Sequence, residues 1–286
     1  MCRFLGYKGA PIVMDHLLYQ PKNSLIHQSY HALERRDPVN GDGFGVGWYM
    51  PGISPTPALF VSIRPAWNNR NLRYLAPKIR SGCIFAHVRA AGTGAVTEPN
   101  CHPFHYGNFL MMHNGNINNF LQIKRELRNR LSDETYNWIT GETDSEHFFA
   151  LFLDYLLREK QARHDHNDMT AALQYALAEL KDIHRRKNAV DSTVLNLLVT
   201  NGKCMVAMRY SNDPAIEAPT LYHSIGSRFE CSNGVCRMKQ TDPSEHAVLI
   251  VSEKLTDAED DWHCVPTGHI IVVKEDLSIS LIPIPG

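Results

Sequence analysis

Short apolar segments of strand length recur along the chain, and turn residues bound each of them. They lie at 83–88 (CIFAHV), 109–113 (FLMMH), 194–200 (VLNLLVT), 204–210 (CMVAMRY), 246–252 (HAVLIVS) and 269–274 (HIIVVK). Their nearly continuous apolar character predicts buried β-strands.

Longer segments between these strands repeat their apolar residues every three or four positions, at 117–131, 145–160 and 169–186. This spacing predicts amphipathic helices. Strands, a helical block and strands again, without a low-complexity linker, predict a single α+β domain over residues 1–286. We expect the least order in PGISPTPA at 51–58, rich in proline and glycine, and in the polar REKQARHDHND at 158–168.

The composition and net charge of the chain limit the kinds of molecule that it is expected to bind. Of the 286 residues 43% are hydrophobic and 21% charged, which suits a compact enzyme with a buried core. A formal net charge of -1 gives no electrostatic basis for binding nucleic acid or an anionic membrane, so a small neutral or zwitterionic partner is expected. No apolar run has the length of a signal peptide or a membrane span, which predicts a soluble, cytoplasmic protein.

The cysteines are scattered and include no C-x-x-C pair: Cys2, Cys83, Cys101, Cys204, Cys231, Cys236 and Cys264. This spacing argues against a disulfide framework and a structural zinc site, and it suits a reduced cytosol. The 15 histidines form no H-E-x-x-H or comparable spacing, so we expect no metal and no other cofactor.

Cysteine is the second residue, and removal of Met1 would leave a thiol and a free α-amine on Cys2. An α-amine titrates near neutral pH and can act as general base for a nucleophile on its own residue, directly or through one water. Cys2 is therefore a candidate N-terminal nucleophile. The alternative is an arbitrary small residue on a first strand.

Glycines alternate in NGDGFGVGWY at 40–49. A period of two places them on one face of a strand, unlike the irregular spacing of a phosphate-binding loop. We expect that bare face to allow another backbone or a helix to approach closely. Asn40 and Asp42 are expected to form a turn.

Arg89 ends an apolar strand and precedes a loop of small residues at 90–94. An arginine in this position can bind a substrate carboxylate through two parallel hydrogen bonds. A surface arginine whose stem covers apolar groups is the alternative.

Two polar clusters, NCHPF at 100–104 and MMHNGNI at 111–117, each adjoin an apolar segment. The side-chain amide of Asn114 and the backbone N–H of Gly115 can form an oxyanion hole for acyl transfer. A tight turn at this Asn-Gly step is the alternative without chemistry. His102 is a candidate substrate-binding residue, although His102 and His113 are also typical of buried histidines with satisfied hydrogen bonds.

GETDSEHF at 141–148 begins an amphipathic helix. Thr143, Asp144 and Ser145 are all common N-capping residues, so a cap explains any one of them. A carboxylate held there can also receive a substrate ammonium. Thr143 and Asp144 are therefore candidate substrate-binding residues.

These motifs together resemble a known family. MCRFLG, HVRA, NCHPF, HNGNI and TDSE occur in the order and spacing of the class II glutamine amidotransferases. The chain resembles most the stand-alone members that degrade glutathione in fungi, and less closely the ergothioneine-pathway amidohydrolases and small bacterial paralogues. The resemblance covers nearly the whole chain, including RRDPVNGDGFGVGWY, PAWNNRNL and SEKLT…DWHCVPTG.

The resemblance implies the four-layer αββα fold of the Ntn hydrolases, with two antiparallel sheets packed face to face between helical layers. It implies that Cys2 is the nucleophile and, through its α-amine, the base, and that Asn114 and Gly115 form the oxyanion hole. It also implies that Arg89 binds the substrate α-carboxylate and Asp144 its α-ammonium. One cation and one anion match the charges of a γ-glutamyl group.

The loop after the arginine departs from the amidotransferases fused to synthase domains, where it carries bulkier polar residues. Here it reads AAGTG, so we expect a substrate larger than glutamine, with glutathione as the leading candidate. The resemblance also implies a metallopeptidase-like partner subunit. We expect no second domain after residue 286, an expectation that argues against a glutaminase feeding a fused synthase. A glutaminase subunit serving a separate synthase and a non-catalytic regulatory subunit of the same fold are the alternatives.

Overall fold

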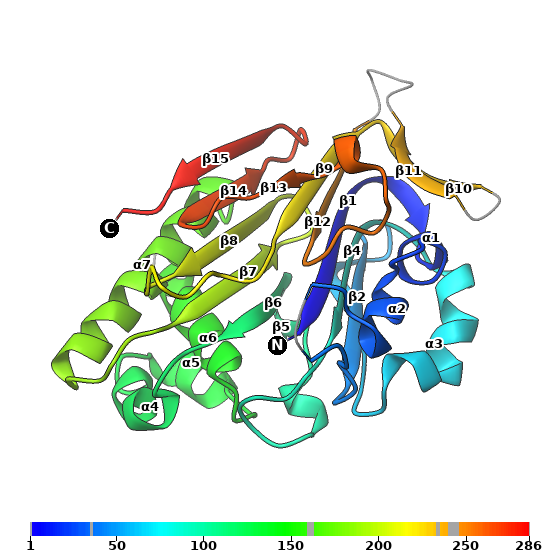
Figure 1. Cartoon of the computed structure of the whole chain (residues 1–286). Coiled ribbons are helices and arrows are strands. Elements are labelled where there is room, and N and C mark those ends of the chain that lie inside the picture. The colour runs from blue at the N-terminus through cyan, green and yellow to red at the C-terminus, as the bar shows by residue number, and fades with distance from the viewer. Residues whose placement is uncertain (1, 35–36, 159–162, 233–234, 240–245, 286) are drawn as a thin grey trace.

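Two antiparallel sheets form the centre of the computed structural model, which describes residues 2–34, 37–158, 163–232, 235–239 and 246–285 (Figure 1). The first sheet has the strand order β13 (His263–Cys264), β9 (Tyr222–Gly226), β12 (Ala247–Val251), β1 (Arg3–Val13), β4 (Arg80–Val88), β2 (Phe44–Met50) and β3 (Ser54–Ser62). The second has the order β15 (Ile279–Pro283), β14 (His269–Val273), β8 (Met205–Ser211), β7 (Val194–Thr200), β6 (Phe109–Asn116) and β5 (Phe104–Tyr106).

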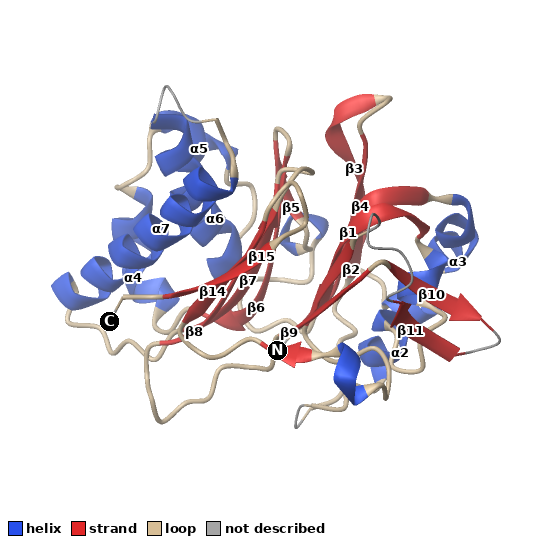
Figure 2. Cartoon of the chain, turned by 90° about the horizontal axis from the view of Figure 1, so that it is seen from above, coloured by secondary structure: helices blue, strands red, loops and turns tan. Residues whose placement is uncertain are grey.

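Helices cover the outer faces of both sheets (Figure 2). On the second sheet lie α4 (Phe120–Arg128), α5 (Asp133–Trp138), α6 (Asp144–Arg158) and α7 (His166–Arg186). On the first lie α1 (Asp15–Leu18), α2 (Leu25–Tyr30), α3 (Arg70–Leu75) and a hairpin of β10 (Arg228–Ser232) and β11 (Val235–Lys239). The predicted four-layer αββα sandwich is confirmed.

Alternation along the strands decides which side chains enter the space between the sheets. Phe4 and Phe85 of the first sheet and Leu110 of the second pack together in that central core. Leu5, by contrast, packs on the outer side of its sheet. The same alternation turns Cys2, two positions before Phe4, toward the second sheet.

The main predicted elements are present. Each predicted strand falls on one of β4, β6, β7, β8, β12 and β14, and each predicted helix on α4, α6 or α7. The expectation of least order at 51–58 is wrong for residues 54–58, which form the start of β3. Since β3 is an edge strand, its prolines need not donate to a neighbour on the open side. In the second segment expected to lack order, 159–162 lie outside the described residues, and α7 begins at His166.

The bare-face prediction holds for two of the four glycines. A β-carbon on Gly45 would overlap the carbonyl of His102, and one on Gly47 would overlap Leu110 of the second sheet. These positions let the facing layer approach closely. Gly41 and Gly43 precede β2, and Gly43 has φ +112, so the prediction of one strand face for all four is wrong.

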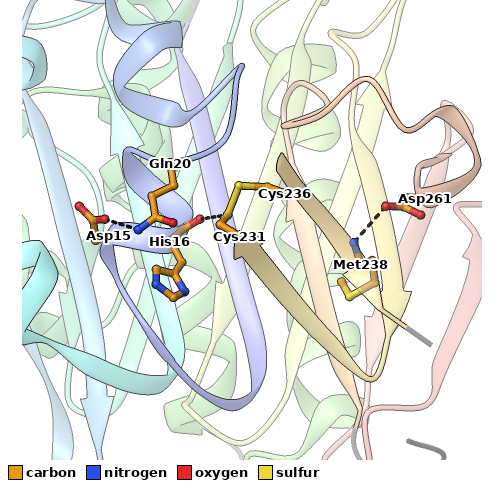
Figure 3. The surroundings of a disulfide bond; sticks show 7 residues. All are labelled: Asp15, His16, Gln20, Cys231, Cys236, Met238 and Asp261. Atoms are coloured by element: carbon orange, nitrogen blue, oxygen red, sulfur yellow. Dashed lines mark hydrogen bonds between the residues drawn. A yellow bond between two sulfur atoms is a disulfide. The ribbon is translucent and has the colours of Figure 1, made fainter. Parts of the chain in front are cut away.

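A disulfide joins Cys231 and Cys236 across the β10–β11 hairpin (Figure 3). The two residues oppose each other in the register of the strands, which brings their side chains together. Cys231 Sγ lies 3.4 Å from the backbone carbonyl of His16, so the bond sits against α1. One local link is not a disulfide framework, but it contradicts a wholly reduced set of cysteines.

Within the described part of the chain, no helix combines the length and apolar character needed to cross a bilayer.

Candidate active site

A small pocket of about 130 Å³ lies where the two sheets open near the N-terminal end of β1. It brings together residues that are far apart in the sequence. Its lining includes Cys2, Arg89, His102, Gly115, Thr143 and Asp144, six of the seven predicted site residues. The seventh, Asn114, adjoins Gly115 in β6 and is completely buried.

Strand pairing places Cys2 beside the loop that follows β4. Arg3 pairs with Val88, so the residue before Arg3 meets the residues after Val88. The Cys2 Sγ lies 3.6 Å from the carbonyl oxygen of Ala90 and 3.5 Å from its backbone nitrogen. Cys2 is half-buried and lines the pocket, which an arbitrary residue on a first strand would not explain.

Arg89 is a buried cation whose guanidinium, among the described residues, donates hydrogen bonds only to backbone carbonyl groups. Arg89 is 2% exposed. Its guanidinium donates hydrogen bonds to the carbonyls of Ala95, Thr93 and Gly94 at 3.1, 3.2 and 3.4 Å. No ion pair joins it to a carboxylate of the described residues. The alternative of a surface arginine is wrong. A buried charge without a counter-ion is costly, and a bound carboxylate would supply the missing partner.

Asp42 holds the loop that carries this arginine, a role that the sequence analysis missed. Its carboxylate accepts a hydrogen bond of 2.8 Å from the backbone N–H of Ala91. Its own N–H donates to the carbonyl of Arg89, and the N–H of Arg89 donates to Gly43. From the sequence, Asp42 could be interpreted only as a turn residue between glycines, because its partner Ala91 is 49 positions further along the chain.

Thr143 and Asp144 make different hydrogen bonds at the start of α6. The Thr143 hydroxyl accepts from the N–H of Glu146 and so caps α6. The Asp144 carboxylate, 5% exposed, accepts from the N–H groups of Ile117 and Ser145, each at 2.8 Å. The N-terminus of the 15-residue helix stabilises this negative charge. No ion pair neutralises Asp144 within the described chain, so the carboxylate can receive a cation.

Three buried imidazoles lie at the pocket: His102 and His113 line it, and His87 stacks on His102. His87 and His102 stack with ring centroids 4.2 Å apart, and the Nε2 of His87 hydrogen-bonds the carbonyl of His113. The Nδ1 of His113 lies 2.8 Å from the hydroxyl of Ser145. Burial lowers the pKa of His87 to about 3 and the pKa of His102 and His113 below the usual value, so all three are neutral at pH 7.

The expectation that the buried His102 has hydrogen-bond partners is wrong. Neither of its ring nitrogens has a partner among the described residues, although His102 is buried and lines the pocket. An unsatisfied buried polar group is costly and is found where a ligand or water completes it. His87, the other member of the stack, belongs to the HVRA motif, but its sequence position alone did not separate it from an ordinary strand residue.

Asn114 and Gly115 lie within β6, so the alternative of a tight turn is wrong. Asn114 pairs directly with Asn196 of β7, and both amide atoms of its side chain have no partner in the described structure. A β-carbon on Gly115 would overlap a backbone carbonyl of β7, which explains the glycine by packing. A buried amide with unused donors beside the pocket is able to bind an anionic oxygen.

The pocket thus lies beside the N-terminal end of β1 in a four-layer αββα sandwich. The family model "Glutamine amidotransferases class-II" matches residues 19–282. The chain is also 42% identical over 302 aligned positions to the probable glutamine amidotransferase DUG3 of Saccharomyces cerevisiae, covering 99% of this chain and 84% of that protein. The chain therefore belongs to the class-II glutamine amidotransferases.

Two other comparisons agree with this assignment. The chain is 37% identical to the γ-glutamyl-hercynylcysteine sulfoxide hydrolase of Mycobacterium tuberculosis over 117 residues, which is 40% of this chain and 49% of that protein. The solved structure of a glutamine aminotransferase class-II domain protein from Silicibacter pomeroyi is 26% identical, with a TM-score of 0.69 and 100% coverage of both chains.

Proposed function

We propose that the chain hydrolyses the γ-glutamyl amide bond of a small γ-glutamyl compound through a thioester on Cys2. After loss of Met1, the α-amine takes the proton of the Cys2 thiol, and the sulfur attacks the γ-carbonyl carbon. Asn114 and Gly115 bind the resulting oxyanion. The amine leaves with the transferred proton, and water then cleaves the thioester and releases glutamate.

The arrangement of charge around Cys2 carries this proposal. Arg89 and Asp144 both line the pocket of Cys2, and neither has an oppositely charged partner within the described chain. An α-amino acid brings one carboxylate and one ammonium, which would complete both groups. A volume of about 130 Å³ is well below the roughly 300–1,000 Å³ of pockets for drug-sized ligands, and it suits a single glutamyl group.

The leaving group would lie beside the loop of small residues. Ala91 and Gly92 are exposed, and a β-carbon on Gly92 would have nothing within 4 Å. This open side leaves room for more than ammonia. The related hydrolase from Mycobacterium tuberculosis is named for a γ-glutamyl group on a cysteine derivative. We therefore infer a γ-glutamyl-cysteine type of bond, with glutathione as the leading candidate.

Turnover of three substrates by the purified chain tests this function. Glutathione, γ-glutamyl-cysteine and glutamine would be compared by the rate of glutamate release, with Cys2→Ser as the inactive control. We expect both thiol compounds to be hydrolysed with a higher kcat/KM than glutamine. Hydrolysis of glutamine alone would favour a glutaminase that serves a separate synthase.

Two further measurements separate the remaining alternatives. The intact mass of the purified chain shows whether Met1 is removed, and its retention would exclude a mechanism that uses the α-amine of Cys2. Activity of the chain by itself, compared with activity after adding a metallopeptidase-like subunit, tests the partner implied by the family resemblance. A chain without Met1 that binds but never hydrolyses these compounds would indicate a regulatory subunit.

A further inference from the structure

A buried ion pair lies directly behind Cys2, on the side facing away from the pocket. Arg3 belongs to β1 and Glu253 follows β12, which pairs with β1. The register pairs Leu5 with Val251, so Arg3 stands opposite Glu253. Arg3 has 1% exposure and Glu253 has 0%, and the Nε of Arg3 donates to a carboxylate oxygen of Glu253.

The guanidinium of Arg3 reaches three different parts of the chain. Besides the Nε contact, its Nη1 donates to the carbonyl of Cys2 at 2.8 Å, and its Nη2 donates to the carbonyl of Glu34 at 3.1 Å. The carbonyl of Cys2 belongs to the same residue as the proposed nucleophile and base. Arg3 therefore holds the main chain of Cys2 from behind, while the Cys2 side chain faces the pocket.

Glu253 binds the same neighbouring segment as Arg3. Its carboxylate accepts the backbone N–H of Leu33 at 2.9 Å and that of Glu34 at 3.1 Å. Asn23 also approaches it at 3.4 Å. One buried carboxylate and one buried guanidinium thus link β1, the end of β12 and residues 33–34 by hydrogen bonds at a single point.

We propose that Arg3 and Glu253 are positioning residues that fix the main chain of Cys2 for attack. The inference rests on the proposed function, in which Cys2 is the nucleophile. A thiol and an α-amine on one residue can exchange a proton and reach the γ-carbonyl only in a narrow range of main-chain orientations. The fork of an arginine can fix that orientation through several directed hydrogen bonds, which a lysine cannot do.

Conservative variants of the full chain test this role. Arg3→Lys keeps the charge opposite Glu253 but cannot serve all three partners, and Glu253→Gln keeps the shape but removes the charge. Lys22→Met, which breaks an exposed ion pair with Asp257, is the matched control. For each protein, kcat and KM would be measured for a γ-glutamyl substrate. Rates would be normalised to the Cys2 sites that react with 6-diazo-5-oxo-norleucine.

We expect Arg3→Lys and Glu253→Gln to lower kcat roughly tenfold or more, the effect of losing one charge-assisted hydrogen bond. KM should change less than about twofold because Arg89 and Asp144 are untouched. Lys22→Met should match the wild type. If either folded variant kept the wild-type kcat per reactive site, the inference would be overturned. Loss of folding in both variants would also overturn it, because it would indicate a purely structural ion pair. A wild-type chain without turnover would instead refute the proposed function.

Discussion

Replacing Asp144 by asparagine removes the negative charge of the pocket while keeping the size and shape of the side chain. In the wild type both carboxylate oxygens accept backbone N–H groups, from Ile117 and Ser145. Asparagine has one acceptor oxygen and can satisfy only one of them. One buried donor then faces the amide NH₂, which costs roughly 1–3 kcal/mol of stability.

The effect on catalysis is separate from this loss of stability. A hydrogen bond between Asp144 and a substrate ammonium is charged on both sides, and such a bond contributes about 1.5–3 kcal/mol. At 1.36 kcal/mol per factor of ten, its loss lowers kcat/KM about 10- to 150-fold. The change should be largely in KM, because the ammonium is bound in the ground state as well as in the transition state.

Two chromogenic substrates make the assay specific to the ammonium. γ-Glutamyl-p-nitroanilide carries the α-ammonium, whereas glutaryl-p-nitroanilide lacks the amine. The wild type should prefer the first, and Asp144→Asn should lose most of that preference, as a double-mutant cycle requires for a direct contact. Asp168→Asn is the matched control, since Asp168 is also a carboxylate in the first turn of a helix and, within the described part of the chain, its side chain bonds only the backbone of Asp165.

An Asp144→Asn protein that is folded and keeps the wild-type preference for the amine-bearing substrate would refute the assignment. An equal loss of activity toward both substrates would also refute it, because it would show damage to the site rather than loss of an ammonium contact.

Other predictions concern the thiols, the packing of β6 and the buried histidines. Cys101→Ala should leave alkylation and turnover unchanged, because burial raises the pKa of the Cys101 thiol to about 11 and leaves it protonated; mass spectrometry of the labelled peptides checks this. Gly115→Ala should lower Tm or prevent folding, because its methyl group would overlap β7, whereas Gly92→Ala should be neutral by thermal melts since its surroundings are open. Stability should fall as the pH drops below about 6.5, where the unfolded chain takes up protons that buried His87, with a pKa of about 3, excludes. The free energy of unfolding should change by up to about 1.4 kcal/mol per pH unit for each such group. This dependence on pH should be weaker in His87→Phe, and urea unfolding between pH 4 and 7 measures it.

The fold could be predicted largely because its strands and helices have clear periodicity. VLNLLVT at 194–200 is mostly apolar apart from Asn196 and Thr200, and β7 is buried along its whole length. The predicted ends of helices and strands were less accurate, because capping depends on local hydrogen bonds. The cap at Thr143 is an example, since the sequence did not distinguish this residue from its neighbours. β3 was missed because edge strands tolerate prolines that the pattern associates with loops.

Candidate site residues could be named from the sequence, but their relation to one another could not. Cys2 and Arg89 meet because β1 and β4 pair in a register that no local pattern encodes. For the same reason Asp42 could be interpreted only as a turn residue, and the ion pair of Arg3 with Glu253, whose partners lie 250 positions apart, was not foreseen. The Cys231–Cys236 disulfide also depends on a strand register, in a hairpin that the sequence analysis did not predict.

The most direct test of the proposed chemistry is a crystal structure of the chain after reaction with 6-diazo-5-oxo-norleucine, an alkylating analogue of glutamine. We expect a covalent adduct on the sulfur of Cys2, with its carboxylate bound by Arg89 and its amine bound by Asp144. An adduct on Cys101, or one on Cys2 with both charged groups turned away from Arg89 and Asp144, would contradict the account.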